Sequence, residues 1–211
     1  MSSLAAYAAV IVTLFAIVDP IGTLPFFVAL TEPFTEADRR VMVHRSVLVL
    51  GAVLASFALV GRFLFEAFGF TLGAFEIAGG ILLFMIAYDM LQGTITRTRL
   101  SSEDQSDAIA RRDELSVVPI GIPLLAGPGA ISTVMIYEGE AGTDILGILA
   151  TFVAIAVVTV SAFFTLRYGQ RILRSLGRVG VMALTRVLGL VLAAVGVQFV
   201  IYGITAVLPH V

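Results

Sequence analysis

Three stretches of this chain carry no charged residue and are each long enough to cross a lipid bilayer: residues 115–137, 145–166 and 187–209. A membrane-spanning helix needs about 20 predominantly apolar residues. Hydrophobic residues make up 59% of the 211 residues, charged residues make up 13%, and the mean hydropathy is +1.04, outside the range of soluble domains. The sequence therefore predicts an integral membrane protein. Its function should lie where the apolar helices are interrupted, because lipid tolerates interruptions only where protein or a cavity surrounds them.

The charge pattern divides the chain into six expected membrane-spanning helices, at about 4–30, 46–61, 71–91, 117–137, 145–166 and 181–207. Six spans and their short loops use the whole length and leave no room for a sizeable soluble domain. We therefore expect an all-α integral membrane protein that forms one transmembrane domain over residues 1–211, with its longest loop at about 92–116.

Arginine is distributed unevenly over the connections between these spans. All 13 basic residues are arginines, and only Arg62 lies on the side opposite the main group, while Arg186 lies within the sixth span. The connections after the first, third and fifth spans hold the other eleven, which are Arg39, Arg40, Arg45, Arg97, Arg99, Arg111, Arg112, Arg167, Arg171, Arg174 and Arg178. Because cytoplasmic loops are enriched in positive charge, the pattern predicts a multi-pass membrane protein with its arginine-rich connections in the cytoplasm and both termini on the outer side.

Two irregular segments occupy corresponding places in the two halves of the chain. Residues 19–23 (Asp-Pro-Ile-Gly-Thr) interrupt the first span, and residues 127–130 (Gly-Pro-Gly-Ala) interrupt the fourth. Three spans per half is an odd number, so the halves would have opposite orientations, with repeat one at about 1–91 and repeat two at about 117–211. Inverted 3+3 repeats with helices broken at matching positions are typical of secondary transporters, whose substrate site lies near the membrane centre.

The residue types at both interruptions favour the start of a new half-helix. Proline suits the first position of a helix, and aspartate is a common N-cap. Two helix N-termini meeting at the membrane centre would attract a carboxylate through their free N–H groups and positive dipole ends. A simple proline kink is the structural alternative. The candidate substrate-binding residues are Asp19, Pro20, Gly22, Thr23, Gly127, Pro128, Gly129, Ala130, Ser132 and Thr133.

Three charged residues within the expected spans are candidates for coupling or charge compensation. Asp19 is either a structural helix cap or a site for an ammonium group or a proton. An ionisable group near the bilayer centre is costly unless it is paired or neutral, so its presence there suggests a function. Glu76 either takes up a proton in a cavity or is hydrogen-bonded structurally. Arg186 either extends to the membrane interface or reaches inward towards Asp19.

The composition argues against several classes of protein. The chain has no cysteine and only two histidines, far apart in sequence, so we expect no metal site. It has no lysine and hence no nucleotide-binding P-loop, and no intramembrane nucleophile paired with a base, so we expect no cofactor and no enzyme activity. The expected partners are the lipid bilayer and a small molecule, with a proton or sodium ion. We expect no nucleic-acid partner. The sequence is compatible with a homo-oligomer.

Several segments of the chain resemble the MarC family of six-span inner-membrane proteins. These are residues 19–27 (Asp-Pro-Ile-Gly-Thr-Leu-Pro-Phe-Phe), 119–133, and 186–190 followed by 197–199. The resemblance covers essentially the whole chain, although Gly121 stands where a larger residue such as alanine is expected. It implies an all-helical fold similar to that of the LysE-type exporter superfamily, and transport of small neutral amino acids.

The function predicted from these observations is secondary transport, by uptake or export, of small neutral amino acids or similar small zwitterions. The alternative is a channel or a structural membrane subunit that transports no amino acid. Counterflow separates the two, because only a transporter is stimulated by unlabelled substrate on the opposite side.

The predicted orientation can be tested by labelling single cysteines, since the native chain has none. A membrane-impermeant thiol reagent applied to intact cells should label the His210→Cys variant and leave the Ser106→Cys variant unlabelled, because the arginine-rich connections stay in the cytoplasm. The reverse pattern would show that the topology is inverted.

Overall fold

The computed structural model describes residues 4–32, 34–69, 71–92, 105–142, 144–174 and 177–207, and every regular element within these ranges is helical. This confirms the all-helical fold. Arg97 and Arg99 lie outside the described residues. The elements are α1 (Leu4–Val18), α2 (Pro20–Thr31), α3 (Glu36–Phe68), α4 (Leu72–Gln92), α6 (Gln105–Leu115), the irregular η1 (Ser116–Leu125), α7 (Pro128–Ala141), α8 (Ile145–Arg174) and α9 (Gly177–Val207).

Five helical stretches in the described part are long and apolar enough to cross a membrane: α3, α4, α8, α9, and α1 with α2 counted together. A sixth is formed by residues 112–125 and 128–139 if this pair, bent by 60°, counts as one span. The boundaries predicted for the second and fifth spans were too short. At about 1.5 Å per residue, the 33 residues of α3 and the 30 residues of α8 exceed the ~30 Å hydrocarbon core, because charged residues end the membrane part of a helix without ending the helix.

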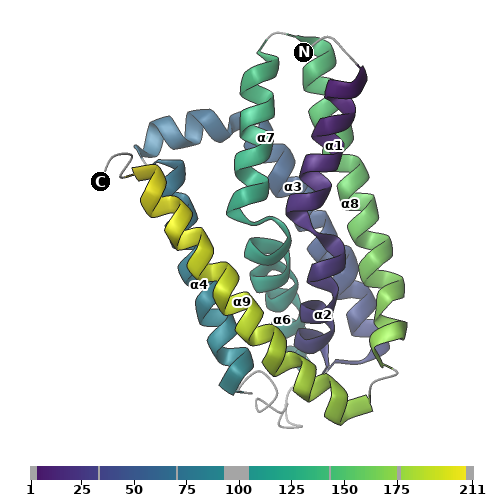
Figure 1. Cartoon of the computed structure of the whole chain (residues 1–211). Coiled ribbons are helices and arrows are strands. Elements are labelled where there is room, and N and C mark those ends of the chain that lie inside the picture. The colour runs from purple at the N-terminus through teal and green to yellow at the C-terminus, as the bar shows by residue number, and fades with distance from the viewer. Residues whose placement is uncertain are drawn as a thin grey trace.

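The helices are arranged in two groups (Figure 1). Helices α1, α2, α3, α7 and α8 stand together, and their buried apolar residues form the main core, which includes Leu14, Phe27, Leu50, Ile131 and Leu166. Helices α4 and α9 run side by side and slant past this bundle. A smaller apolar cluster joins α2 to the α4–α9 pair. The inverted relation between the two halves stays a prediction.

The α4–α9 pair is held by glycines that repeat every seven residues. Gly73 faces Gly203, and Gly80 faces Gly196, while Gly189 continues the row one step further along α9. A Cβ atom built at Gly80 would lie 2.5 Å from the carbonyl oxygen of Gly196, and one at Gly196 would lie 2.7 Å from that of Gly80. The two backbones therefore approach closely, in the manner of small-residue contacts between membrane helices. Side chains at these positions would separate the helices.

The segment η1 is the most irregular part of the described chain. Val118 and Ile122 have extended backbone angles within it, and the amide of Ala126 donates to the carbonyl of Gly121 over 2.9 Å. A Cβ at Gly121 would lie 2.6 Å from Cγ1 of Val49 on α3, which explains why no larger residue stands at this position. Irregular backbone at membrane depth is stable only when protein or a cavity covers it. The close packing of η1 on α3 provides that cover.

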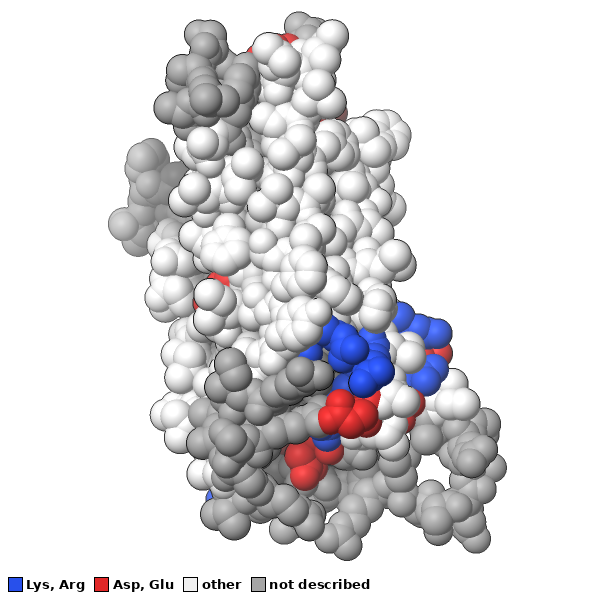
Figure 2. All heavy atoms as spheres, turned by 90° about the vertical axis from the view of Figure 1, so that its right-hand side faces the viewer, with Lys and Arg blue, Asp and Glu red and all other residues white. Residues whose placement is uncertain are grey.

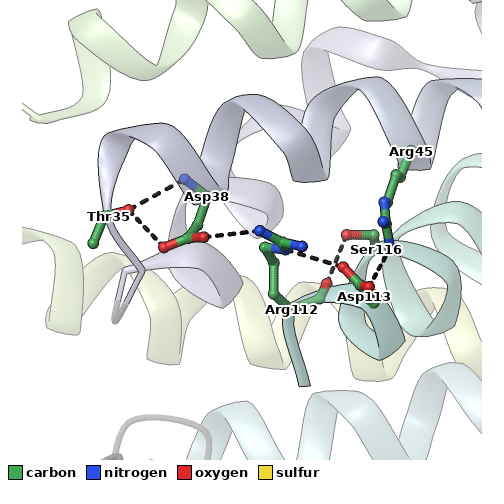
Figure 3. A network of polar contacts seen from close by, with 6 residues as sticks. All are labelled: Thr35, Asp38, Arg45, Arg112, Asp113 and Ser116. Carbon is green, nitrogen blue, oxygen red and sulfur yellow. Dashed lines mark hydrogen bonds and ion pairs between the residues drawn. The ribbon is translucent and has the colours of Figure 1, made fainter. Parts of the chain in front are cut away.

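A polar network joins the start of α3 to α6 and η1 (Figure 3). Arg112 donates to Asp38 over 3.1 Å and to Asp113 over 3.0 Å, and Asp113 also pairs with Arg45 over 2.5 Å. The hydroxyl of Ser116 donates to the carbonyl of Arg112 over 2.7 Å (Figure 3). The carbonyl of Ser116 accepts a hydrogen bond from the hydroxyl of Ser46 on α3 over 2.8 Å.

At the same end of the molecule, Arg39 binds the C-terminus of helix α2. Arg39 donates from Nε to the carbonyl of Thr31 over 2.7 Å and from Nη2 to the carbonyl of Glu32 over 2.6 Å. Such bonds satisfy carbonyls left free at a helix C-terminus. Figure 2 shows most of the visible charged side chains gathered towards the lower end, where α3 and α6 begin. The network around Arg112 and Ser116 therefore holds the first residue of η1, while the last residue of η1, Leu125, is buried in the main apolar core.

Candidate functional site

A cavity of about 410 Å³ lies where the two interrupted regions of the chain meet. Helix α2 runs from this point towards one end of the molecule, and α7 runs towards the other end (Figure 1). Both helices begin at the cavity, as the paired interruptions predicted. Residues from the two interruptions that line it are Ile17, Val18, Asp19, Gly22, Thr23, Pro123, Leu124, Leu125, Gly127, Gly129 and Ala130.

At the first interruption, Asp19 is the N-cap of α2, which confirms the predicted cap. Its backbone adopts the left-handed conformation (φ 41°, ψ 67°), and its carboxylate accepts a hydrogen bond from the amide of Gly22 over 2.9 Å. The amide of Thr23 donates to the carbonyl of Asp19 over 3.0 Å. A Cβ at Gly22 would overlap the second carboxylate oxygen of Asp19, so the cap requires glycine at that position. Pro20, the first residue of α2, has no N–H to satisfy.

At the second interruption, α7 begins without a side-chain cap. Gly127 precedes it with extended backbone angles (φ −74°, ψ 169°), and Pro128 is its first residue. The amide of Ile131 donates to the carbonyl of Gly127 over 3.0 Å. Among the described contacts, the amides of Gly129 and Ala130 have no acceptor, and both residues line the cavity. The start of α7 therefore offers two free donors and the positive end of a helix dipole.

The two helix starts differ in charge. The start of α2 already carries the carboxylate of Asp19, whereas the start of α7 carries no acidic residue in its first turn. Only one oxygen of Asp19 is engaged by Gly22, and the other accepts no hydrogen bond among the described residues. One side of the cavity therefore carries an acidic side chain, and the other side carries free backbone donors. Of the two helix starts that were expected to attract a carboxylate, the start of α2 already bonds to the carboxylate of Asp19, whereas the start of α7 has no side-chain cap.

The opposite wall of the cavity comes from the α4–α9 pair and is entirely apolar. The sequence did not predict this wall, because apolar residues in a membrane helix give no signal of the side they face. Gly79 of α4 packs directly against the ring of Pro128, and a Cβ at Gly129 would lie 3.4 Å from Cε1 of Phe199. The residues that form this wall are Leu83, Leu188, Val191, Leu192, Val195 and Phe199.

Four of the predicted substrate-binding residues lie beside the cavity but do not line it. Pro20 and Pro128 are buried in the helix starts. The hydroxyl of Ser132 donates to the carbonyl of Pro128 over 2.6 Å, and that of Thr133 donates to the carbonyl of Gly129 over 2.7 Å. Both hydroxyls therefore satisfy backbone carbonyls of their own helix, a common arrangement in membrane helices.

The two other charged candidates also lie away from the cavity lining. Glu76 is half-buried on α4, one turn before Gly79, and Arg186 is exposed on α9. No ion pair in the described part of the chain joins Arg186 to Asp19. Within the described ranges, no three acidic or histidine side chains lie together as metal ligands would.

Comparison with known proteins gives one consistent result. A sequence model described as MarC family integral membrane protein matches residues 4–208. The chain is 37% identical over 198 residues to a UPF0056 membrane protein of Pyrococcus abyssi, covering 94% of each protein. It is 33% identical to the UPF0056 membrane proteins YvbG of Bacillus subtilis, covering 95% and 94%, and YhcE of Escherichia coli, covering 93% and 90%. No solved structure matches.

The geometry of Asp19 leads to a prediction about stability. Asp19→Ala should lower the free energy of unfolding by about 1–3 kcal/mol, because it removes the cap and places alanine in a left-handed conformation. Asp19→Asn should stay close to wild type, since asparagine caps helices and tolerates this conformation. Thermal unfolding of the purified variants in one detergent measures both. Equal losses for the two variants would contradict the capping role.

Proposed function

The chain belongs to the MarC family of integral membrane proteins, and we propose that it is a secondary transporter of small zwitterions such as neutral amino acids. The observation that carries this proposal is the cavity between the two helix starts, with a carboxylate on one side and unbonded amides on the other. The description of the matching family names no catalytic activity.

The two ends of a zwitterion fit the two sides of the cavity. The free oxygen of Asp19 would accept hydrogen bonds from the substrate ammonium, and the amides of Gly129 and Ala130 would donate to its carboxylate. A carboxylate at membrane depth is costly unless it is paired or protonated. A bound ammonium group or a coupling proton would therefore stabilise Asp19, which links substrate binding to charge compensation.

Asp19 is the better placed of the two candidate proton carriers, because it lines the cavity whereas Glu76 does not. A proton or sodium gradient, or the gradient of an exported substrate, would drive the cycle. We place the protein in the cell inner membrane with both termini on the outer side, on the basis of the arginine distribution.

Alternating access would follow from a movement of the α4–α9 pair against the bundle. The glycine contacts make the pair a close unit, and it meets the bundle on either side of the cavity. On one side Gly79 packs on Pro128. On the other, Phe26 and Ala29 of α2 belong to one apolar cluster with Ala87 of α4. Opening one contact while the other stays closed would expose the cavity to each side of the membrane in turn.

The competing function is a channel or a structural subunit. A channel needs a continuous path, whereas this cavity lies between two packed apolar contacts. Counterflow in reconstituted vesicles decides between them, because unlabelled substrate on the far side accelerates a transporter and leaves a channel unchanged.

We expect Asp19→Asn to abolish counterflow while the protein still reaches the membrane in normal amounts. Asparagine preserves the cap and removes the negative charge that would hold the ammonium group or the proton. The measurement is uptake of labelled alanine into vesicles loaded with unlabelled alanine, with protein amount fixed by quantitative blotting. Full counterflow by the Asp19→Asn variant would remove Asp19 from the binding site.

We also expect a cross-link between the α4–α9 pair and the bundle to stop transport. In the Ala29→Cys/Ala87→Cys variant, a short bis-thiol reagent would join α2 to α4, and counterflow should fall to background until the reagent is cleaved. The matched controls are the single variants Ala29→Cys and Ala87→Cys treated with the same reagent, in which no link between α2 and α4 can form and counterflow should be retained. Normal counterflow with the link formed, as judged by gel mobility, would exclude the proposed movement.

A further inference from the structure

We propose that the cavity selects zwitterions with a long apolar side chain over glycine and alanine. This inference rests on the proposed transport function and names the substrate class of the same cavity. The argument comes from the way polar and apolar groups are divided over the cavity wall.

Only two of the nineteen lining residues, Asp19 and Thr23, have polar side chains. Both belong to the start of α2, and the free amides belong to the start of α7, so the polar groups lie at the helix starts. The wall formed by α4 and α9 offers no hydrogen-bond donor or acceptor from its lining side chains. A zwitterion with its ammonium and carboxylate groups at the helix starts would therefore direct its side chain towards the apolar wall.

The size of the cavity exceeds what a small amino acid can fill. A volume of about 410 Å³ lies within the ~300–1,000 Å³ range of pockets that enclose drug-sized ligands. Glycine or alanine bound at the helix starts would leave the apolar part unfilled. Water is a poor occupant there, because an ordered water needs about two to four polar partners. An apolar side chain of several carbons would fill this space and displace water from the wall.

The wall residues belong to packed helices, which keeps the apolar space in place. Leu83 is only 3% exposed, and Leu192 lies in the same apolar cluster as Phe26 of α2. Burial of one methylene group stabilises a complex by about 0.8 kcal/mol, which corresponds to about a fourfold change in Kd. A linear series of side chains should therefore bind more tightly with each added carbon until the space is full.

The test is isothermal titration of the purified full-length protein with alanine, 2-aminobutyrate, norvaline and norleucine. We expect Kd to fall about fourfold at each step, or about 60-fold over the series. A Kd that is flat or rises with chain length overturns this inference while the transport proposal stands. Absence of binding by every member, together with absence of alanine counterflow, overturns both proposals.

A pair of variants tests whether the apolar wall formed by α4 and α9 causes the gain in affinity with side-chain length. Leu83→Phe should weaken norleucine binding at least tenfold and weaken alanine binding much less, because the larger ring occupies the space of the long side chain. Leu82→Phe, on an exposed neighbouring position of the same helix, should leave the whole series unchanged. If Leu83→Phe does not fold, Val195→Phe at a lining position that is 41% exposed serves the same purpose. Equal effects of the lining variant and of Leu82→Phe would overturn the inference.

Discussion

The hydrogen-bonding requirement of the backbone in lipid governs this structure. A membrane helix satisfies its own N–H and C=O groups, and each interruption leaves some of them without partners. At Asp19 the side chain takes over one of these bonds, and the left-handed backbone lets α2 start in nearly the same direction in which α1 ended. Between Val118 and Gly127 the chain departs further from helical geometry, and there it packs against α3. The amides of Gly129 and Ala130, which have no acceptor among the described contacts, lie at the cavity.

The position of the cavity follows from the way the two groups of helices are packed. Glycines bring α4 and α9 so close that their backbones touch, which leaves their larger apolar side chains to face other elements. Gly79 repeats this arrangement at the edge of the cavity, where it admits the ring of Pro128. The proline that starts α7 therefore rests against the pair directly. The space beyond it is bounded by the pair on one side and by the two helix starts on the other.

The sequence predicted those features of the site that depend on local chemistry. Asp19 before proline predicted a cap, and the Gly-Pro-Gly segment at 127–129 predicted a second helix start; the structure contains both. It did not predict the apolar wall or the extended residues Val118 and Ile122, because these depend on contacts between helices that are distant in sequence. The seven-residue spacing of Gly73 and Gly80, matched by Gly196 and Gly203, was a readable signal for the α4–α9 contact. The roles given to Glu76 and Arg186 stay predictions.

The two helix starts differ in their side-chain caps, so the two sides of the cavity suit ligand groups of opposite charge. If both starts carried an acidic cap, their dipoles would be compensated and an anionic group would find no donor. If neither did, the site would favour simple anions. With a carboxylate at the start of α2 and free amides at the start of α7, the proposed zwitterion would satisfy both sides at once. Binding in this way would fix the orientation of the ligand, and hence the wall that its side chain would meet.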